Sequence, residues 1–291
     1  MDRWAEWLLN KRFGGNKEIA NYSLQRLGEA RDRIFSAANI SLGNTVVDIG
    51  SGDGLLAIAA IEKVGPTGKV IFVDISQDAL SICQEFCREK LQVDNTQFIC
   101  TSAEDLSDIP TESVDVIVAR AVLMYVSDKT KCFREFYRIL RDDGRISISE
   151  PVNQFTAKAI ADKKNFFGLD FQPLGELGDR LLSNFNFPPN FTEDPMLNFN
   201  EHDLMIGLYE AGFNKLSLQF NASINSDTKW YSWDAFMKMA INPTVPSFSE
   251  AFQTFSPVEQ EKIEAYLKPL VESSFILQAF GEAFVSGSKK K

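Results

Sequence analysis

A glycine-rich turn is the part of the sequence whose residue types and spacing best suit ligand chemistry. It is the stretch 46–54 (VVDIGSGDG), which lies between an expected strand and an expected helix. Glycine lets a backbone turn tightly and approach a ligand closely. A nicotinamide-binding fingerprint requires Gly-x-Gly-x-x-Gly, but counted from Gly50 its third glycine falls on Leu55. The spacing is instead Gly-x-Gly-x-Gly, with Asp48 two residues ahead, which argues against a nicotinamide dehydrogenase.

Short apolar runs that alternate with helical patterns must position this turn. The runs predict five strands, over 45–49, 69–74, 96–100, 114–119 and 145–150. Apolar spacing and end signals predict helices over 55–64, 76–91 and 129–140. This alternation predicts βαβ units in a mostly parallel sheet, and the near-continuous apolar strands fit a sheet that is covered on both faces.

The pattern changes after Pro151, where periodicity weakens and phenylalanine accumulates. The segment holds Phe155, Phe166, Phe167, Phe171, Phe185, Phe187, Phe191 and Phe199. We expect it to form an apolar substrate pocket, or else an insertion with its own aromatic core. Asn200 can cap a helix that ends at 211–212, and strands are expected over 213–224 and 275–286, separated by a second helical insertion with Trp230 and Trp233.

In order and spacing, these motifs resemble class I S-adenosylmethionine (SAM)-dependent methyltransferases. The resemblance depends on Asp48 with the glycines of the turn, on Asp74 at the end of the second strand, and on the segments 101–106, 120–121 and 133–144. It covers residues 45–150 well and 200–224 more loosely. It implies an α/β, Rossmann-like, mostly parallel seven-stranded sheet with helices on both faces. It also implies SAM as the cofactor and S-adenosylhomocysteine as the product.

Eleven residues match the positions at which this family holds its cofactor. They are Asp48, Gly50, Ser51, Gly52, Gly54, Asp74, Ile75, Ser102, Ala103, Glu104 and Arg120. The Asp74 carboxylate can accept hydrogen bonds from both ribose hydroxyls. The family has an acid at the Ser102 position for the adenine amino group, so here Glu104 or Asp105 is expected to replace it. Arg120 would lie beside the methionine part of the ligand.

Within the family, the sequence resembles the small-molecule branch that includes ubiquinone and menaquinone C-methyltransferases. A further resemblance, to natural-product methyltransferases of terpenoid or indole compounds, depends on Arg12-Phe13-Gly14-Gly15 and Asn242-Pro243. The expected activity is methyl transfer to a small, apolar or aromatic organic acceptor. Two alternatives stay open: a SAM-binding protein without methyl transfer (a cyclase, sensor or partner subunit), and a methyltransferase acting on a macromolecule.

Candidates for the acceptor side are fewer. Glu150 ends the fifth strand and could orient an acceptor or take its proton, or it could simply cap the next segment. Tyr125 could line the acceptor pocket or pack in the core. Trp4, Trp7 and Leu8 form an N-terminal apolar stripe that could close over the cofactor, contact another subunit or pack against the chain's own core.

The single histidine and the four cysteines predict no metal site. His202 falls in the first turn of the helix capped by Asn200, where we expect it to face solvent. Cys83 and Cys87 lie one helical turn apart without further ligands nearby. We expect them, and also Cys100 and Cys132, to be small buried hydrophobes. A thiol-based methyltransferase of a metalloid would need exposed, convergent cysteines.

Composition limits the partners. The 291 residues carry 40 acidic and 30 basic side chains, a formal net charge of -10, which disfavours nucleic-acid binding. The basic run 289–291 is expected to be a solvated, frayed end. No apolar run approaches the roughly 18 residues of a membrane span, and no secretory signal is recognised, so a cytoplasmic location is expected. A homo-oligomer stays open.

These patterns suggest six consecutive units along the chain. They are an N-terminal helical segment (1–42), a SAM-binding core (43–150), a phenylalanine-rich substrate cover (151–199), a core helix and strand (200–224), a second helical insertion (225–272) and a last core strand (273–288).

Overall fold

The computed structural model of the chain describes residues 1–14, 17–160, 162–229 and 232–290. Gly15, Trp230 and Lys291, named above, lie outside these ranges.

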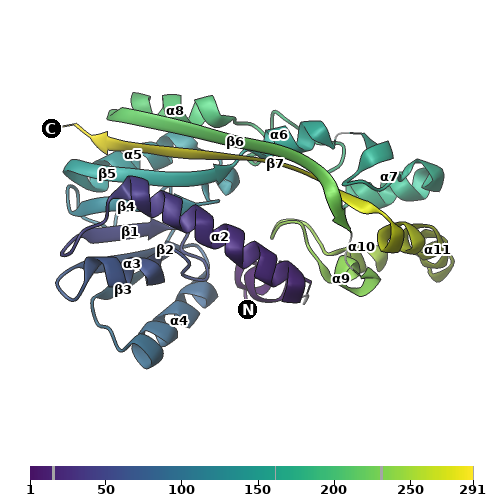
Figure 1. The fold of residues 1–291 in the computed structure, drawn as a ribbon, viewed down its shortest axis with the longest axis horizontal. Coiled ribbons are helices and arrows are strands. Elements are labelled where there is room, and N and C mark those ends of the chain that lie inside the picture. The colour runs from purple at the N-terminus through teal and green to yellow at the C-terminus, as the bar shows by residue number, and fades with distance from the viewer. Residues whose placement is uncertain (15–16, 161, 230–231, 291) are drawn as a thin grey trace.

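The fold is built on one seven-stranded sheet, as the sequence predicted. Its strands are β1 (Thr45–Ile49), β2 (Lys69–Asp74), β3 (Thr96–Cys100), β4 (Val114–Arg120), β5 (Leu140–Pro151), β6 (Phe213–Lys229) and β7 (Phe275–Lys289). They lie in the order β3-β2-β1-β4-β5-β7-β6 (Figure 1). The first five pair in parallel, whereas β7 is antiparallel to both β5 and β6. The order reverses at β1, so the loops after β1 and β4 diverge and leave a crevice at the carboxyl ends of the strands.

Helices cover both faces of this sheet, and others lie beyond its end. The helices of the described chain are α1 (Arg3–Glu6), α2 (Lys17–Ala38), α3 (Ala57–Val64), α4 (Gln77–Phe86), α5 (Lys129–Ile139), α6 (Asn153–Ala159), α7 (Glu176–Ser183), α8 (Glu201–Glu210), α9 (Trp233–Lys238), α10 (Phe248–Phe252) and α11 (Pro257–Ser273). A π-helical turn, Trp7–Lys11, follows α1 directly.

Alternation along the strands divides the core of the sheet into two layers. In β1, Val46 packs with α2, α3 and α4, whereas its neighbour Val47 packs with α5 and α8. β4 divides in the same way, with Val116 on the first face and Ile117 on the second. Successive strand residues point to opposite faces, so apolar runs such as VVDI and VIVA fill both layers at once.

Local end signals fix the helices that carry the site. The Ser76 hydroxyl accepts a hydrogen bond from the Ala79 amide at 3.0 Å and caps α4. Asn200 caps α8 and forms a capping box with Asp203. Asn200 is the cap that the sequence analysis expects, and Ser76 stands at the expected start of its helix.

A long β6–β7 hairpin joins the sheet to a separate helical part formed by α7 and α9–α11 (Figure 1). The expectation that β6 ends at residue 224 was wrong, because its pairing with β7 continues to Lys229. The expectation for the basic run 289–291 was wrong at Lys289. Lys289 is only 6% exposed, its ammonium group donates to the Leu140 carbonyl at 2.8 Å, and it lies over the Tyr137 ring. These partners satisfy the charge, so the residue ends β7 instead of fraying.

Most of the phenylalanine-rich segment packs into its own core. Phe166, Phe171 and Phe185 are buried together with Phe236 and Phe248 from the second insertion. Phe199 instead packs in the core of the sheet. None of the eight phenylalanines of this segment lines the cavity described below. Of the two alternatives for the segment, the structure therefore shows an insertion with its own aromatic core.

Candidate active site

A cavity lies at the carboxyl ends of β1, β2 and β4, where an open α/β sheet places its ligands. Its walls come from the β1–α3 turn, the end of β2, the segment 101–104, the turn after β4, the N-terminal segment and Pro243. Of the residues expected to hold the cofactor, all but Gly54 line this cavity.

The β1–α3 turn forms the floor of the cavity and needs glycine on steric grounds. Gly50 has a φ of 66°, and a Cβ at this position would lie 2.3 Å from Val122 Cγ2. Asp48 is buried, and its carboxylate accepts a hydrogen bond from the Ala57 amide at 2.8 Å, which ties the turn to the start of α3. Burial raises the pKa of Asp48 well above its ordinary value. Gly54 shapes the same turn but does not reach the cavity wall.

Asp74 links this turn to the end of β2. One of its carboxylate oxygens accepts from the Gly52 amide and the other from the Ser76 amide, each at 2.8 Å. Burial raises the pKa of Asp74, and the two amide hydrogen bonds oppose that rise because they favour the charged form. Each oxygen keeps a second lone pair, so the carboxylate can still accept from a ligand hydroxyl.

The segment after β3 supplies the next wall. Ser102, Ala103 and Glu104 all line the cavity. The Glu104 carboxylate accepts from the Ser102 hydroxyl at 3.3 Å and from the Asp128 amide at 2.9 Å. Asp105 does not line the cavity and instead accepts from the Ser107 amide. Of the two acids considered for this wall, Glu104 is therefore the one that lies on it.

Two buried polar atoms on the wall lack a hydrogen-bond partner among the described residues, and these are the Ser51 hydroxyl oxygen and Arg120 Nε. Burial lowers the pKa of the Arg120 guanidinium, and the nearby carboxylates of Glu282 and Glu150 oppose that shift. A second guanidinium, that of Arg12, also lines the cavity and lies 3.8 Å from the Asp53 carboxylate. A buried polar atom without a partner costs free energy unless a ligand or water satisfies it.

The N-terminal segment covers the cavity. Trp4, Trp7 and Leu8 all line it, so of the roles considered for this stripe the structure places it over the ligand site. The Trp7 indole donates to the Ala240 carbonyl at 2.9 Å. Tyr125, from the turn after β4, also lines the cavity and meets the Trp4 ring edge to face at 5.0 Å.

Glu150 does not line the cavity, in contrast to its expected place on the acceptor side. It is fully buried, and its carboxylate accepts from the amides of Val122, Leu123 and Met124 at 2.9 to 3.3 Å. The alternative, a cap on the segment after the strand, also differs from this arrangement, because the carboxylate binds the earlier turn after β4. Burial raises the pKa of Glu150 to about 7, and the three amide hydrogen bonds oppose that rise.

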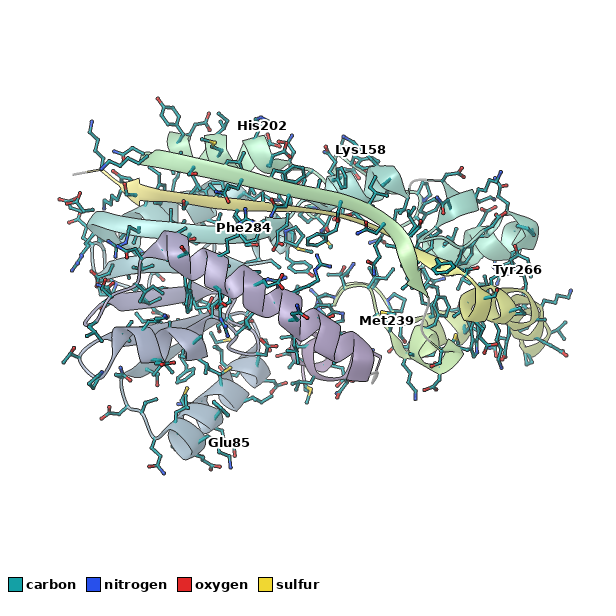
Figure 2. The ribbon with its side chains drawn as sticks, in the orientation of Figure 1. Glu85, Lys158, His202, Met239, Tyr266 and Phe284 are labelled. Atoms are coloured by element: carbon teal, nitrogen blue, oxygen red, sulfur yellow. The ribbon has the colours of Figure 1, made fainter. Side chains whose placement is uncertain are left out.

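His202 and the cysteines lie apart from the cavity. His202 is on the outer surface of α8 with 79% of its side chain exposed, as expected (Figure 2). Cys83, Cys87 and Cys132 are buried, also as expected. The expectation for Cys100 was wrong, because it ends the edge strand β3 and is exposed. Within the part of the chain that the structure describes, no cluster of His, Cys, Asp or Glu side chains is arranged to hold a metal ion.

Several wall residues were not assigned to the site from the sequence. Arg12 and Pro243 had been noted only for a resemblance, and Asp53 only as part of the glycine turn. They come from positions as far apart as 12 and 243, so no local pattern could bring them together.

In the described ranges, no helix combines the length and apolar character needed to cross a membrane.

Comparisons with known proteins find methyltransferases among those similar to this chain. A family model described as a methyltransferase domain matches residues 40–183. A ubiquinone/menaquinone biosynthesis C-methyltransferase, UbiE, from Hydrogenovibrio crunogenus is 25% identical over 69% of this chain and 78% of its own length. An arsenite methyltransferase from Halobacterium salinarum is 34% identical, over 43% of this chain and 31% of its own length. The solved structure of the YcgJ protein from Bacillus subtilis matches in fold with a TM-score of 0.54 and 17% identity, and covers 90% of this chain and 99% of that one.

The sheet order, the glycine turn below the cavity and these matches agree on one class of protein, the methyltransferases. The chain is a SAM-dependent methyltransferase, and SAM is its cofactor. The cavity fits that cofactor. Asp74 offers acceptors to a ribose diol, and Ser51 and Arg120 present the unpartnered donors that a carboxylate would satisfy.

Proposed function

We propose that this enzyme methylates a small aromatic organic compound of quinone or similar type, with an electron-rich atom as the acceptor. The observation that carries the proposal is the aromatic cover of the cavity, formed by Trp4, Trp7 and Tyr125 next to the Arg120 wall. Aromatic faces favour both a planar acceptor and a sulfonium. The similarity to UbiE, which is named for ubiquinone and menaquinone biosynthesis, supports the same class of acceptor.

The residues proposed to hold the cofactor divide by the part of SAM that they would contact. Asp74 would accept from the ribose hydroxyls, and Glu104 would accept from the adenine amino group. The Ser51 hydroxyl and the Arg120 guanidinium would donate to the methionine carboxylate, since both have buried atoms without a partner among the described residues. Gly50 and Gly52 would let the backbone approach the ligand. Asp48 would act indirectly, by fixing the turn through Ala57.

Bound SAM supplies a methyl group whose bond to sulfur breaks, leaving the electron pair on sulfur while an electron pair of the acceptor forms the new bond. The protein's own contribution is to orient the acceptor and to exclude water. Tyr125 would do both as a protonated phenol, because burial raises its pKa well above the ordinary value. Tyr125 keeps its proton, and Glu150 does not reach the cavity, so neither is placed to act as a general base there. This favours an acceptor that needs no early deprotonation.

The arsenite methyltransferase relative suggests a metalloid as another kind of acceptor, which cysteine thiolates of this chain would have to bind. Three of the four cysteines are buried, and burial raises the pKa of the Cys83 thiol to about 12 and that of Cys132 further. A thiol held in its neutral form is a poor ligand for a metalloid. The cysteines therefore give no support to arsenite as the acceptor.

Calorimetric titration with SAM and S-adenosylhomocysteine tests the cofactor site. We expect micromolar binding to the wild type, loss of binding in Asp74→Ala, and unchanged binding in Asp94→Ala, a control that removes an exposed acid. Equal binding in all three proteins would contradict the proposed role of Asp74. The acceptor is then sought by incubation with SAM and quinone, indole or terpenoid compounds, with mass spectrometry of the products.

The same assay separates this proposal from its alternatives. Tight SAM binding without methylation of any aromatic compound would favour a cyclase, sensor or partner subunit. Methylation of a protein or RNA instead would favour a macromolecular acceptor, and RNA binding would weaken steeply with salt.

A further inference from the structure

A second cavity adjoins the cofactor cavity and shares Trp4 and Tyr125 with it. Its volume is about 560 Å³, which is within the usual range for small-molecule sites, and it opens to the surface. Pro243 lines the first cavity and its neighbour Thr244 lines the second, so this loop borders both. The cofactor cavity therefore has a neighbour large enough for another ligand.

The shared wall is an edge-to-face pair of rings that is held from two sides. The Trp4 and Tyr125 centroids are 5.0 Å apart with an interplanar angle of 79°. The Trp4 backbone amide is bound by the Asp2 carboxylate, and the Arg3 guanidinium lies 5.1 Å from the Trp4 ring centroid. On the other side, Glu150 holds the backbone that leads into Tyr125. The position of both rings is thus fixed by the folded chain.

The lining of the second cavity combines apolar walls with polar residues. Pro188, Pro195 and Met196 add apolar surface to that of the two shared rings. Arg3, Asn186 and Glu193 bring hydrogen-bonding groups to the same cavity. Proline, methionine and aromatic edges suit the face of a planar ring, while the polar groups suit its substituents.

The insertion fixes this lining by contacts with the core. The Lys129 ammonium donates to the Val126 carbonyl and to the Pro195 carbonyl, both at 3.0 Å, so it joins the turn after β4 to the loop that carries Pro195 and Met196. The Asp194 carboxylate accepts from the Met196 amide at 2.9 Å. The second cavity is therefore bounded by a loop that is anchored to the same turn as Tyr125.

We propose that this second cavity is the acceptor site and that it takes an aromatic ring with hydrogen-bonding substituents. The reacting atom would point toward the cofactor cavity along the border that the two rings and the 243–244 loop form, while the substituents contact the polar residues of the second cavity. The inference rests on the proposed function and adds the place and the shape of the acceptor. It assigns recognition to the residues 186–196 and Thr244, and not to the phenylalanines that pack inside the insertion.

The test fills the second cavity without touching the first. Thr244→Trp and Glu193→Trp place an indole there from two different loops, and Thr254→Trp is the control at an exposed threonine that does not line the cavity. The probe is 2-naphthol, titrated calorimetrically into each full-length protein saturated with S-adenosylhomocysteine. Both of these tryptophan variants should weaken 2-naphthol binding roughly tenfold or more, since the indole occupies the surface that 2-naphthol would contact. The control should bind it as the wild type does.

Binding of S-adenosylhomocysteine alone keeps the two proposals apart. It should be unchanged in both filled variants, which also shows that they are folded. Wild type that fails to bind S-adenosylhomocysteine would contradict the proposed function itself. If that binding is intact, three results would contradict the proposed acceptor site. They are that 2-naphthol does not bind, that it competes with S-adenosylhomocysteine, or that both tryptophan variants leave its affinity unchanged.

Discussion

Single residues show how much the role of a side chain depends on what it meets. Glu150 ends a strand beside the cavity, yet its carboxylate receives the amides of residues 122–124 and faces away from the cavity. It is a positioning residue for the turn that carries Val122 and Tyr125. Gly50 of the glycine turn packs closely against Val122. A shift of the turn that carries Val122 would therefore also disturb the glycine turn, which forms the floor of the cofactor cavity.

Glu150 gives a prediction about pH. The folded protein holds the Glu150 proton up to about pH 7, and the ordinary pKa is 4.5. Between these values the folded state binds more protons than the unfolded state, so the free energy of unfolding falls as pH rises. From pH 4.5 to 7.5, wild type should lose on the order of 3 kcal/mol relative to Glu150→Gln, which does not titrate. Urea unfolding of both proteins across this range measures the difference.

A constant difference between the two proteins over that range would show that Glu150 keeps an ordinary pKa when folded. A comparison of kcat with the KM for SAM would add a second check. A positioning role predicts that Glu150→Gln keeps much of the activity that Glu150→Ala loses, because the amide oxygen of glutamine can still accept from the turn.

At the scale of elements, the N-terminal segment is the part of the site that a few contacts hold in place. Asp2 caps α1 by accepting from the amides of Trp4 and Ala5, each at 3.0 Å. The same carboxylate accepts from the Ser76 hydroxyl at 2.7 Å, which joins α1 to the residue that caps α4. Trp7 makes a further attachment, to Ala240. The cover over the cofactor cavity therefore depends on distant parts of the chain.

Removing the Asp2 carboxylate should loosen this cover. Loss of an N-cap costs about 1 kcal/mol, which corresponds to roughly fivefold in an equilibrium constant. We expect Asp2→Ala to weaken S-adenosylhomocysteine binding by about that factor, measured by calorimetry. Asp32→Ala, which removes an exposed acid of α2, should bind as wild type. An unchanged affinity in Asp2→Ala would mean that α1 is not part of the closed site.

The whole molecule has a sheet with two packed faces and a third core inside the insertions. Phe166, Phe171 and Phe185 from the first insertion pack with Phe236 and Phe248 from the second. This third core holds together two segments that flank β6 in the chain, and the same segments carry Met196, Thr244 and Pro243 to the two cavities. The stability of the insertions and the shape of the acceptor side are thus linked.

Truncation inside the third core should be costly. Phe236 is fully buried, and we expect Phe236→Ala to lower the free energy of unfolding by roughly 3 to 5 kcal/mol in urea titrations. Phe275→Ala is the matched control, because that ring is 45% exposed and its loss should cost less than about 1 kcal/mol. Similar losses in both variants would show that the third core contributes little to global stability.

The sequence by itself determined the sheet and the cofactor turn of this protein. The five parallel strands, the cap residues and the glycine turn all depend on contacts between neighbours in the chain, on strand alternation and on backbone sterics, which local residue order specifies. For the same reason, Asp74 and the segment 102–104 could be expected at the site: each follows a parallel strand whose carboxyl end must face the same crevice.

Only the tertiary structure decided what closes the site. Trp4, Arg12, Tyr125 and Pro243 meet through contacts between segments that no period in the sequence relates. It also decided that Glu150 faces a turn, that Lys289 is buried and that Cys100 is not, because burial is set by the elements that happen to pack alongside. Local order fixes which elements form, whereas the direction and partners of a side chain are fixed by the distant chain that packs on it.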